Sequence, residues 1–456
     1  RGARVSLIMA ADSAPGDLTH VLGTYLDRHL VFPLLEFLQE KELYKADDIL
    51  QGKLALLYPT NMVDFAMDIY KKLHNTDEVP EEMVSRRQAA VQRLESLTEE
   101  TAPIREVLDD AALVQRLRDE KCFTMSHLTE QRGVPAGALG SLYEWARFQY
   151  ECGNYEGAAE CLHHFRLLTT NPEQAFLAQW GKFGAEVLNR RWDVALEDMN
   201  KLKETIESRV GSTPPLMVLQ QRSWLMHWAL YVFFNHPEGR AAMVDLCFQD
   251  RYLNALQTNC PHLLRYLVVA VTLSKRKQAV LRELTRLIAQ EDTNFTDPTT
   301  RFLKALVEDT DFDGALRELA DCEAVMASDY FLVQLKDEFM HSAKLLVFES
   351  YCRIHRRIDI ESVARMLSMS VEDAERWVVN LVRDAHLDAR IDSQANHVVI
   401  APVVPSVYQK VIEKTKGLQF RSLVLSNAIE QRAAEAAAKA AASALQPAAA
   451  AAEGAK

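Results

Sequence analysis

Apolar residues recur at intervals of three and four positions through nearly all of residues 17–355, and Gly and Pro are sparse there. This spacing places apolar side chains on one face of an α-helix, whereas a half-buried strand would need strict alternation. The pattern therefore predicts an α-helical body. A stripe from Leu18 to Leu30 is followed by Pro33, and because proline interrupts a helix we expect a helical hairpin that breaks there.

One short motif appears three times in the body, as an aromatic, a small and an aliphatic residue at positions i, i+3 and i+7. The copies are Tyr155–Ala158–Leu162, Trp192–Ala195–Met199 and Phe312–Ala315–Leu319. An acidic residue directly follows the aromatic in each copy. The first two copies are spaced close to the ~34-residue tetratricopeptide period, but the third lies much further along. We predict a degenerate helical-repeat solenoid of this type, which would expose an extended binding surface.

The pattern changes between Ile358 and Ile400. Asp359 begins a helical stripe that reaches Leu367, and Ser370 can cap a second amphipathic helix over residues 372–384. Two strand-like runs follow at residues 387–391 and 397–400, and turn-forming residues join them. Two helices followed by a hairpin predict a winged helix, which a last repeat helix over residues 341–355 would enter without a flexible linker.

A heptad pattern follows the winged helix. Its apolar positions are Tyr408, Val411, Leu418, Leu425 and Ile429, with Val404 preceding them and Thr415 and Ser422 interrupting them. A single helix with such a seam requires partner helices. The last residues are mostly alanine, too poor in large apolar groups to fold on a core.

These patterns divide the chain into five segments. We expect a disordered N-terminus (1–16), helical repeats (17–340), a winged-helix part (341–404), a bundle helix (405–431) and a disordered Ala-rich tail (432–456). Residues 1–8 precede Met9 and are not assigned to the native protein.

Charge argues against nucleic acid as the ligand of the winged helix. Its second helix carries Glu372, Asp373, Glu375 and Asp384 against Arg376 and Arg383, and the whole chain has a formal charge of -12. Phosphate recognition depends on Lys and Arg, so this helix favours protein contacts. One basic patch contains Lys275, Arg276, Lys277, Arg282 and Arg286. We interpret it as a solvated helix face, with RNA contact as the alternative.

Candidate chemistry is sparse. The seven cysteines form no CxxC pair, and neither a Walker loop nor an HExxH motif occurs. Cys352 and His355 supply two ligands where structural zinc needs four. His163 and His164 are adjacent, so they point about 100° apart on a helix, and we expect one buried and one exposed ring. We predict no catalytic residue, metal, cofactor, small-molecule substrate or membrane span.

Helical repeats fused to a winged helix and a seam-forming helix resemble the PCI domain of the proteasome lid, the signalosome and translation initiation factor three. Particular blocks are similar to the e-subunit family of initiation factor three: DRHLVFPLLEFL (27–38), QGKLALLYPTNMVDFAMDIYKKL (51–73), FQYECGNYEGAAECL (148–162), FFNHPEGR (233–240), YLNALQTNCPHLLRYL (252–267) and AERWVVNLVRDAHLDARIDSQANHVVI (374–400). The similarity is loose over residues 101–140 and stops in the alanine-rich tail.

The resemblance implies a noncatalytic cytoplasmic scaffold, with a nuclear pool left open. Its neighbours would be the PCI subunits c and l and the d subunit, and it would help to bring messenger RNA to the small ribosomal subunit. PCI subunits of this kind pair wing to wing, which makes Val398, Val399 and Ile400 the expected edge for strand addition, while the seam would join a helical bundle. The alternatives are a proteasome-lid or signalosome subunit, or a winged-helix nucleic-acid-binding protein.

Overall fold

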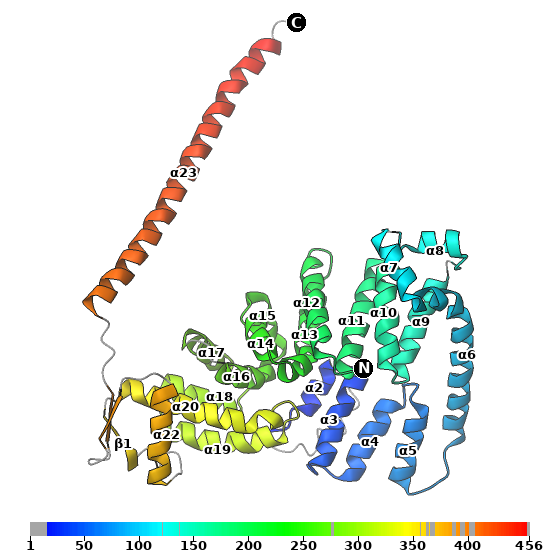
Figure 1. Cartoon of the computed structure of the whole chain (residues 1–456), viewed down its shortest axis with the longest axis horizontal. Coiled ribbons are helices and arrows are strands. Elements are labelled where there is room, and N and C mark those ends of the chain that lie inside the picture. Colours follow the sequence, from blue (N-terminus) through cyan, green and yellow to red (C-terminus); the bar gives the residue numbers. More distant parts are fainter. Residues whose placement is uncertain are drawn as a thin grey trace. The chain divides into compact units, whose positions relative to one another are not determined.

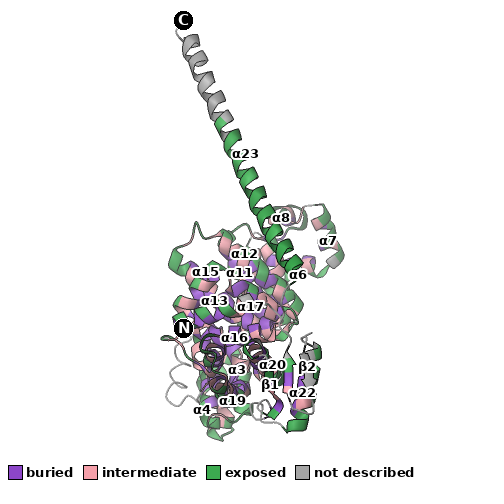
Figure 2. Ribbon diagram, turned by 90° about the vertical axis from the view of Figure 1, so that its left-hand side faces the viewer, coloured by how far each residue is buried: buried purple, intermediate pink, exposed green. Residues whose placement is uncertain are grey.

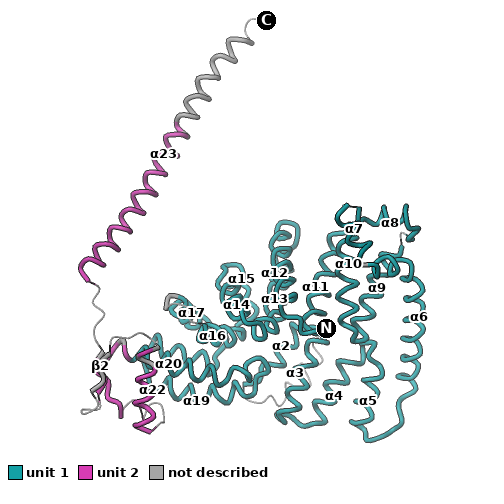
Figure 3. Tube along the Cα trace, in the orientation of Figure 1, with its two compact units in different colours: residues 1–351 teal, residues 352–456 magenta. Residues whose placement is uncertain are grey.

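A computed structural model divides the chain into two compact units, Arg1–Tyr351 and Cys352–Lys456 (Figure 3). The structure describes residues 16–453 except 121, 136, 275–277, 356, 362–363, 365–369, 385–388, 393–396 and 401–405. Fifteen of the sixteen residues of the expected disordered N-terminus thus lie outside the described residues. The division between the units falls later than the predicted boundary at 340/341, because one helix, α20 (Lys336–Ile354), runs through both positions.

Unit 1 is built from helices, which confirms the mainly α fold class (Figure 1). Its first half contains α2 (Thr19–Tyr25), α3 (Arg28–Glu40), α4 (Ala46–Leu57), α5 (Val63–His74), α6 (Glu81–Asp109), α7 (Ala111–Asp119), α8 (Met125–Arg132), α9 (Ala138–Glu151), α10 (Tyr155–Leu168) and α11 (Pro172–Leu188). Its second half contains α12 (Trp192–Ser208), α13 (Pro215–Asn235), α14 (Gly239–Cys247), α15 (Asp250–Asn259), η1 (Pro261–Leu263), α16 (Leu264–Leu273), α17 (Gln278–Glu291), α18 (Pro298–Lys304), η2 (Ala305–Asp309), α19 (Phe312–Ser328), η3 (Val333–Leu335) and α20.

The expected hairpin near the N-terminus exists, but its break is not at Pro33. Helix α2 ends at Tyr25, and Asp27 caps α3 by accepting a hydrogen bond from the backbone N–H of His29. Pro33 lies inside α3, where it removes one backbone hydrogen bond without ending the helix. The capping aspartate, a favoured helix-start residue, marks the break more reliably than the proline.

All three copies of the motif begin a helix at the aromatic residue, at Tyr155, Trp192 and Phe312. The small residue of each copy, Ala158, Ala195 or Ala315, is fully buried, as the close approach of a helix pair requires. Adjacent helices also pack in sequence order through this region, α9 on α10, α10 on α11, α11 on α12 and α12 on α13. The predicted repeat character is therefore present in the packing.

The N-terminal helices depart from a simple stack. Helix α3 packs on α11, and α2 packs on α13. The Tyr25 ring stacks on the His227 ring of α13 with 4.1 Å between centroids, and Trp228 donates its indole N–H to the Tyr25 carbonyl at 3.1 Å. Trp224 and Trp228 also meet Trp180 edge-on, so this aromatic cluster is a packed helix face. Unit 1 is thus closed by contacts between its beginning and its middle.

The second unit contains a three-stranded antiparallel sheet. The strands are β1 (Arg357–Asp359), β2 (Ala389–Asp392) and β3 (His397–Ile400), in the order β1-β3-β2. Strand β1 was not predicted, because the spacing of apolar residues after Asp359 favours a helix with Asp359 as its cap. Instead Asp359 pairs with His397, and Ile358 is buried against the sheet. The first helix of the predicted winged helix lies largely outside the described residues, and the second is α22 (Val371–Asp384).

The chain ends in one long helix, α23 (Val407–Glu453). The tail from residue 432 was expected to be disordered, but the helix continues through it to Glu453. Alanine has the highest helix propensity of all residues, which explains why the tail extends the helix instead of ending it. None of the described helices combines the length and apolarity needed to cross a membrane.

Candidate partner-binding surfaces

Helix α22 presents a charged face, as the sequence suggested. Ser370 caps it, since the backbone N–H of Asp373 donates to the Ser370 hydroxyl at 3.2 Å. Glu372, Asp373 and Arg376 are exposed, while Ala374 and Val378 are buried. Because the first turn is acidic and faces solvent, this helix is poorly suited to a phosphate backbone.

The expected free edge at Val398, Val399 and Ile400 is wrong, because β3 is the central strand. Val398 and Val399 pair with β1 on one side and β2 on the other, and Ile400 pairs with Ala389. The outer edges of the sheet belong to β1 and β2 instead. Val399 is nevertheless 41% exposed and Val398 is fully buried, so these residues contribute a face of the sheet.

Large apolar side chains are exposed all along the first half of α23, a stretch that is coloured as exposed in Figure 2. The predicted seam residues are among them, with exposed fractions of 81% for Tyr408, 56% for Val411, 63% for Leu418, 65% for Leu425 and 60% for Ile429. Monomeric proteins rarely leave such a continuous apolar stripe in water. Such a stripe is typical of a surface that is buried against a binding partner.

Further apolar residues of α23 lie outside the predicted seam. Val407 and Ile412 widen it, whereas Phe420, Leu423 and Val424 occupy the other side of the helix, since each residue advances about 100° around the axis. Alternating steps of three and four define a single stripe, so the sequence pattern did not reveal this second cluster. Between Leu418 and Ile429 the helix is apolar on most of its circumference, which is typical of a helix buried among several others.

The predicted basic patch is described only in part. Lys275, Arg276 and Lys277 lie outside the described residues. Arg282 and Arg286 are exposed one turn apart on α17, opposite the buried Leu284, Leu287 and Ile288. This arrangement fits the solvated helix face that the sequence favoured.

His163 and His164 are both half-buried, in place of the expected buried and exposed pair. His163 Nε2 lies 3.2 Å from a guanidinium nitrogen of Arg118. Burial, together with the neighbouring His164, lowers the pKa of His163 to about 4. A neutral His163 ring that accepts a hydrogen bond from Arg118 fits this half-buried position. All seven cysteines are free thiols.

Comparison with known families gives the class of protein first. Residues 319–402 match the PCI domain, which spans α19 to the end of the sheet, and residues 17–149 match the domain described as "eIF3 subunit 6 N terminal domain". Residues 406–426, within the apolar part of α23, match the C-terminal region of the E subunit of eukaryotic translation initiation factor 3. These matches define a PCI-domain subunit of a translation initiation factor complex.

Relatives along the whole chain give the family. The chain is 46% identical over 422 residues to the E subunit of eukaryotic translation initiation factor 3 from Arabidopsis thaliana, covering 90% of this chain and 96% of the relative. The protein of the same name from Aspergillus fumigatus is 43% identical over 413 residues, covering 89% and 91%, and that from Phaeosphaeria nodorum is 43% identical over 411 residues, covering 89% and 94%. The chain belongs to the E-subunit family of eukaryotic translation initiation factor 3.

Proposed function

We propose that the protein is a noncatalytic scaffold, which joins other subunits of initiation factor 3 through α23 and the winged-helix sheet. The observation that carries the proposal is the exposed apolar surface of α23, where the seam from Tyr408 to Ile429 and the cluster at Phe420, Leu423 and Val424 face solvent. Burial of such surface stabilises an assembly by about 25 cal/mol per Å². Two apolar sides support a bundle of several helices over a single coiled-coil partner.

The sheet supplies a second contact in this proposal. Unpaired backbone groups at the edge of a sheet bind another strand readily. The outer edge of β2, at residues 389–392, replaces the edge first expected at β3. Wing-to-wing addition would then extend the sheet into a neighbouring PCI subunit.

The partners expected in the cytoplasm are the PCI subunits c and l, the d subunit and the helices of the bundle. In this arrangement the protein supports recruitment of messenger RNA to the small ribosomal subunit without binding the RNA by α22. The acidic, exposed first turn of α22 supports that division of roles.

The test replaces three seam residues, as Val411→Asp, Leu418→Asp and Leu425→Asp in one variant. Each buried carboxylate would cost several kcal/mol in an apolar bundle, so the variant should lose the other factor subunits in affinity purification from a eukaryotic lysate. Because these positions are exposed in the chain alone, its circular dichroism and unfolding temperature should not change.

The matched control carries Lys410→Gln, Arg421→Gln and Ala428→Asp. These three exposed positions lie together about 100° around α23 from the middle of the seam, and the control lowers the net charge by the same three units as the seam variant. It should retain its partners. Undiminished assembly of the seam variant would exclude α23 as the assembly element. Recovery of proteasome-lid or signalosome subunits with the wild-type chain would exclude initiation factor 3 as the complex that the chain joins.

A further inference from the structure

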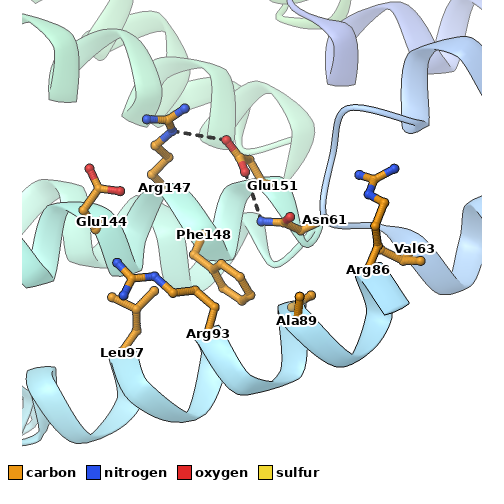
Figure 4. A pocket seen from close by; sticks show the side chains of 11 residues that line it. Asn61, Val63, Arg86, Ala89, Arg93, Leu97, Glu144, Arg147, Phe148 and Glu151 are labelled. Carbon is orange, nitrogen blue, oxygen red and sulfur yellow. Dashed lines mark hydrogen bonds and ion pairs between the residues drawn. The ribbon is translucent and has the colours of Figure 1, made fainter. Parts of the chain in front are cut away.

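A hollow lies between α6 and α9 of unit 1, beside the turn that precedes α5 (Figure 4). Its volume is about 440 Å³, which falls within the range of about 300–1,000 Å³ typical of ligand sites. Phe148 and the buried Leu97 form an apolar floor, and the small side chains of Ala89 and Ala90 leave it open. The hollow can therefore accommodate an apolar side chain of a ligand.

Three guanidinium groups, those of Arg86, Arg93 and Arg147, surround this floor. Arg147 Nε donates to Glu151 at 3.1 Å, and the second oxygen of Glu151 accepts from Asn61 at 3.0 Å, so both oxygens of this carboxylate already accept a hydrogen bond (Figure 4). The guanidinium groups of Arg86 and Arg93 can still form ion pairs with the carboxylates of a ligand.

Neither Arg86 nor Arg93 makes a close carboxylate contact among the interactions of the described residues. Arg86 donates to the Thr60 carbonyl at 3.2 Å and packs over the Tyr58 ring. The Arg93 guanidinium lies 3.9 Å from the nearer oxygen of its ion-pair partner Glu100, beyond hydrogen-bond distance. Arginine pairs with carboxylates through two parallel hydrogen bonds, and such pairs are among the stronger polar contacts in proteins.

Arg147 and Glu151 also line a second hollow, of about 230 Å³. This second hollow adds Arg28 as a cation, and Tyr143 and Leu177 as apolar wall. Two adjoining hollows separated by one ion pair favour an extended chain over a compact ligand. A groove rich in arginine is also unusual in a chain with a formal charge of -12.

We propose that this groove, formed by the two hollows, binds an extended acidic peptide segment of a partner protein. An apolar side chain of the peptide sits on Phe148 and Leu97, and its carboxylates pair with Arg86 and Arg93. RNA is the weaker candidate, because it carries a phosphate at every nucleotide, whereas a peptide can place two carboxylates on Arg86 and Arg93 and neutral residues beside Asp27, Glu144 and Glu151, which also line the groove. The proposal does not depend on α23, so either can fail without the other.

The test measures fluorescence anisotropy of labelled probes with the full chain. One probe is a pool of short peptides with a single Phe and two Asp or Glu residues among neutral residues, the second has Asn and Gln in place of the acids, and the third is oligouridine RNA. We expect binding of the acidic pool alone. Arg93→Glu should weaken it about tenfold, since an attractive contact becomes repulsive.

Arg87→Glu is the matched control, because Arg87 lies on the same helix, outside the groove, and pairs with Asp64 where both side chains are more than half exposed. It should change the affinity less than about twofold. Ala89→Trp fills the hollow from an exposed position and should also abolish binding. Equal binding of the neutral pool or of RNA, equal effects of the two arginine variants, or no binding of the acidic pool would overturn the proposal.

Discussion

At the scale of single residues, two histidines in the core of unit 1 fix each other's protonation state. His227 Nδ1 lies 2.6 Å from the Ser223 carbonyl, which can only accept, so Nδ1 carries the proton. His227 Nε2 must then accept from His262 Nε2 at 2.8 Å. Burial lowers the pKa of His227 to about 4, and burial, with His227, Arg265 and His20 nearby, holds the pKa of His262 well below its usual value. Both rings are therefore neutral in the folded chain.

The neutral pair predicts a loss of stability in acid. Since the folded pKa of His227 is depressed, the unfolded chain takes up its proton first as the pH falls from about 6.5 toward 4. This one residue should cost about 2 kcal/mol at about pH 5. Urea unfolding at about pH 7 and about pH 5 measures the cost, and His227→Gln, which keeps a donor for Ser223, should reduce it. A substitution at the exposed His74 should leave this loss of stability in acid unchanged. Equal pH dependence of stability in His227→Gln and in the wild type would contradict the assignment of the loss to His227.

At the scale of elements, the three motif copies share a backbone feature that their side chains did not indicate. The residue two positions before each aromatic adopts a left-handed conformation, with φ of 89° at Gly153, 59° at Arg190 and 54° at Thr310. The next residue is the N-cap, and Asn154 and Asp311 accept from the backbone N–H groups of Gly157 and Gly314. Only the first copy shows this turn in its sequence, because Gly153 suits it and Arg190 and Thr310 do not.

The strained copy gives a prediction. Thr310→Asn should raise the unfolding temperature and stabilise the chain by about 0.5–1 kcal/mol, because asparagine tolerates the left-handed region and a β-branched residue does not. Gly153→Ala should lower the unfolding temperature. Its added Cβ would lie 3.3 Å from Met62 Cε, and the positive φ at this position is unfavourable for alanine. Thermal circular dichroism compares both with Thr98→Asn, an exposed site within α6. A Thr310→Asn variant no more stable than Thr98→Asn would exclude strain at this turn.

The sequence predicted elements wherever local spacing was strong. The motif helices, α22 with its Ser370 cap and strand β3 were placed correctly, because side-chain periodicity and capping are local properties. Strand β1 was missed because three residues are too short to show a period. The edge of the sheet was misassigned because strand order depends on a strand that precedes the hairpin by two helices.

At the scale of the whole unit, the closure of its N-terminal helices on its middle was beyond prediction from spacing. Arg265 shows the reason. Its side chain is 1% exposed and donates to the Gly16 carbonyl at 2.7 Å and to both carboxylate oxygens of Asp297, and it also contacts Asp329 at 3.2 Å. These partners lie far apart in the sequence, and no local pattern connects them. Burial opposes the charge of Arg265, but the two aspartates raise its pKa above the usual value.

This closure predicts different effects for truncation at the two ends. Removal of residues 1–26 takes away α2, the stack on His227 and the carbonyl that Arg265 binds, so it uncovers buried apolar and polar groups together. We expect it to destabilise unit 1 by at least about 3 kcal/mol and to lower its unfolding temperature by several degrees. Removal of residues 407–456 takes away a helix whose described side chains are exposed throughout, and should leave that temperature unchanged. Calorimetry of the two truncated chains tests this prediction. Equal unfolding temperatures would mean that α2 does not stabilise unit 1 and that the remaining helices fold stably without it.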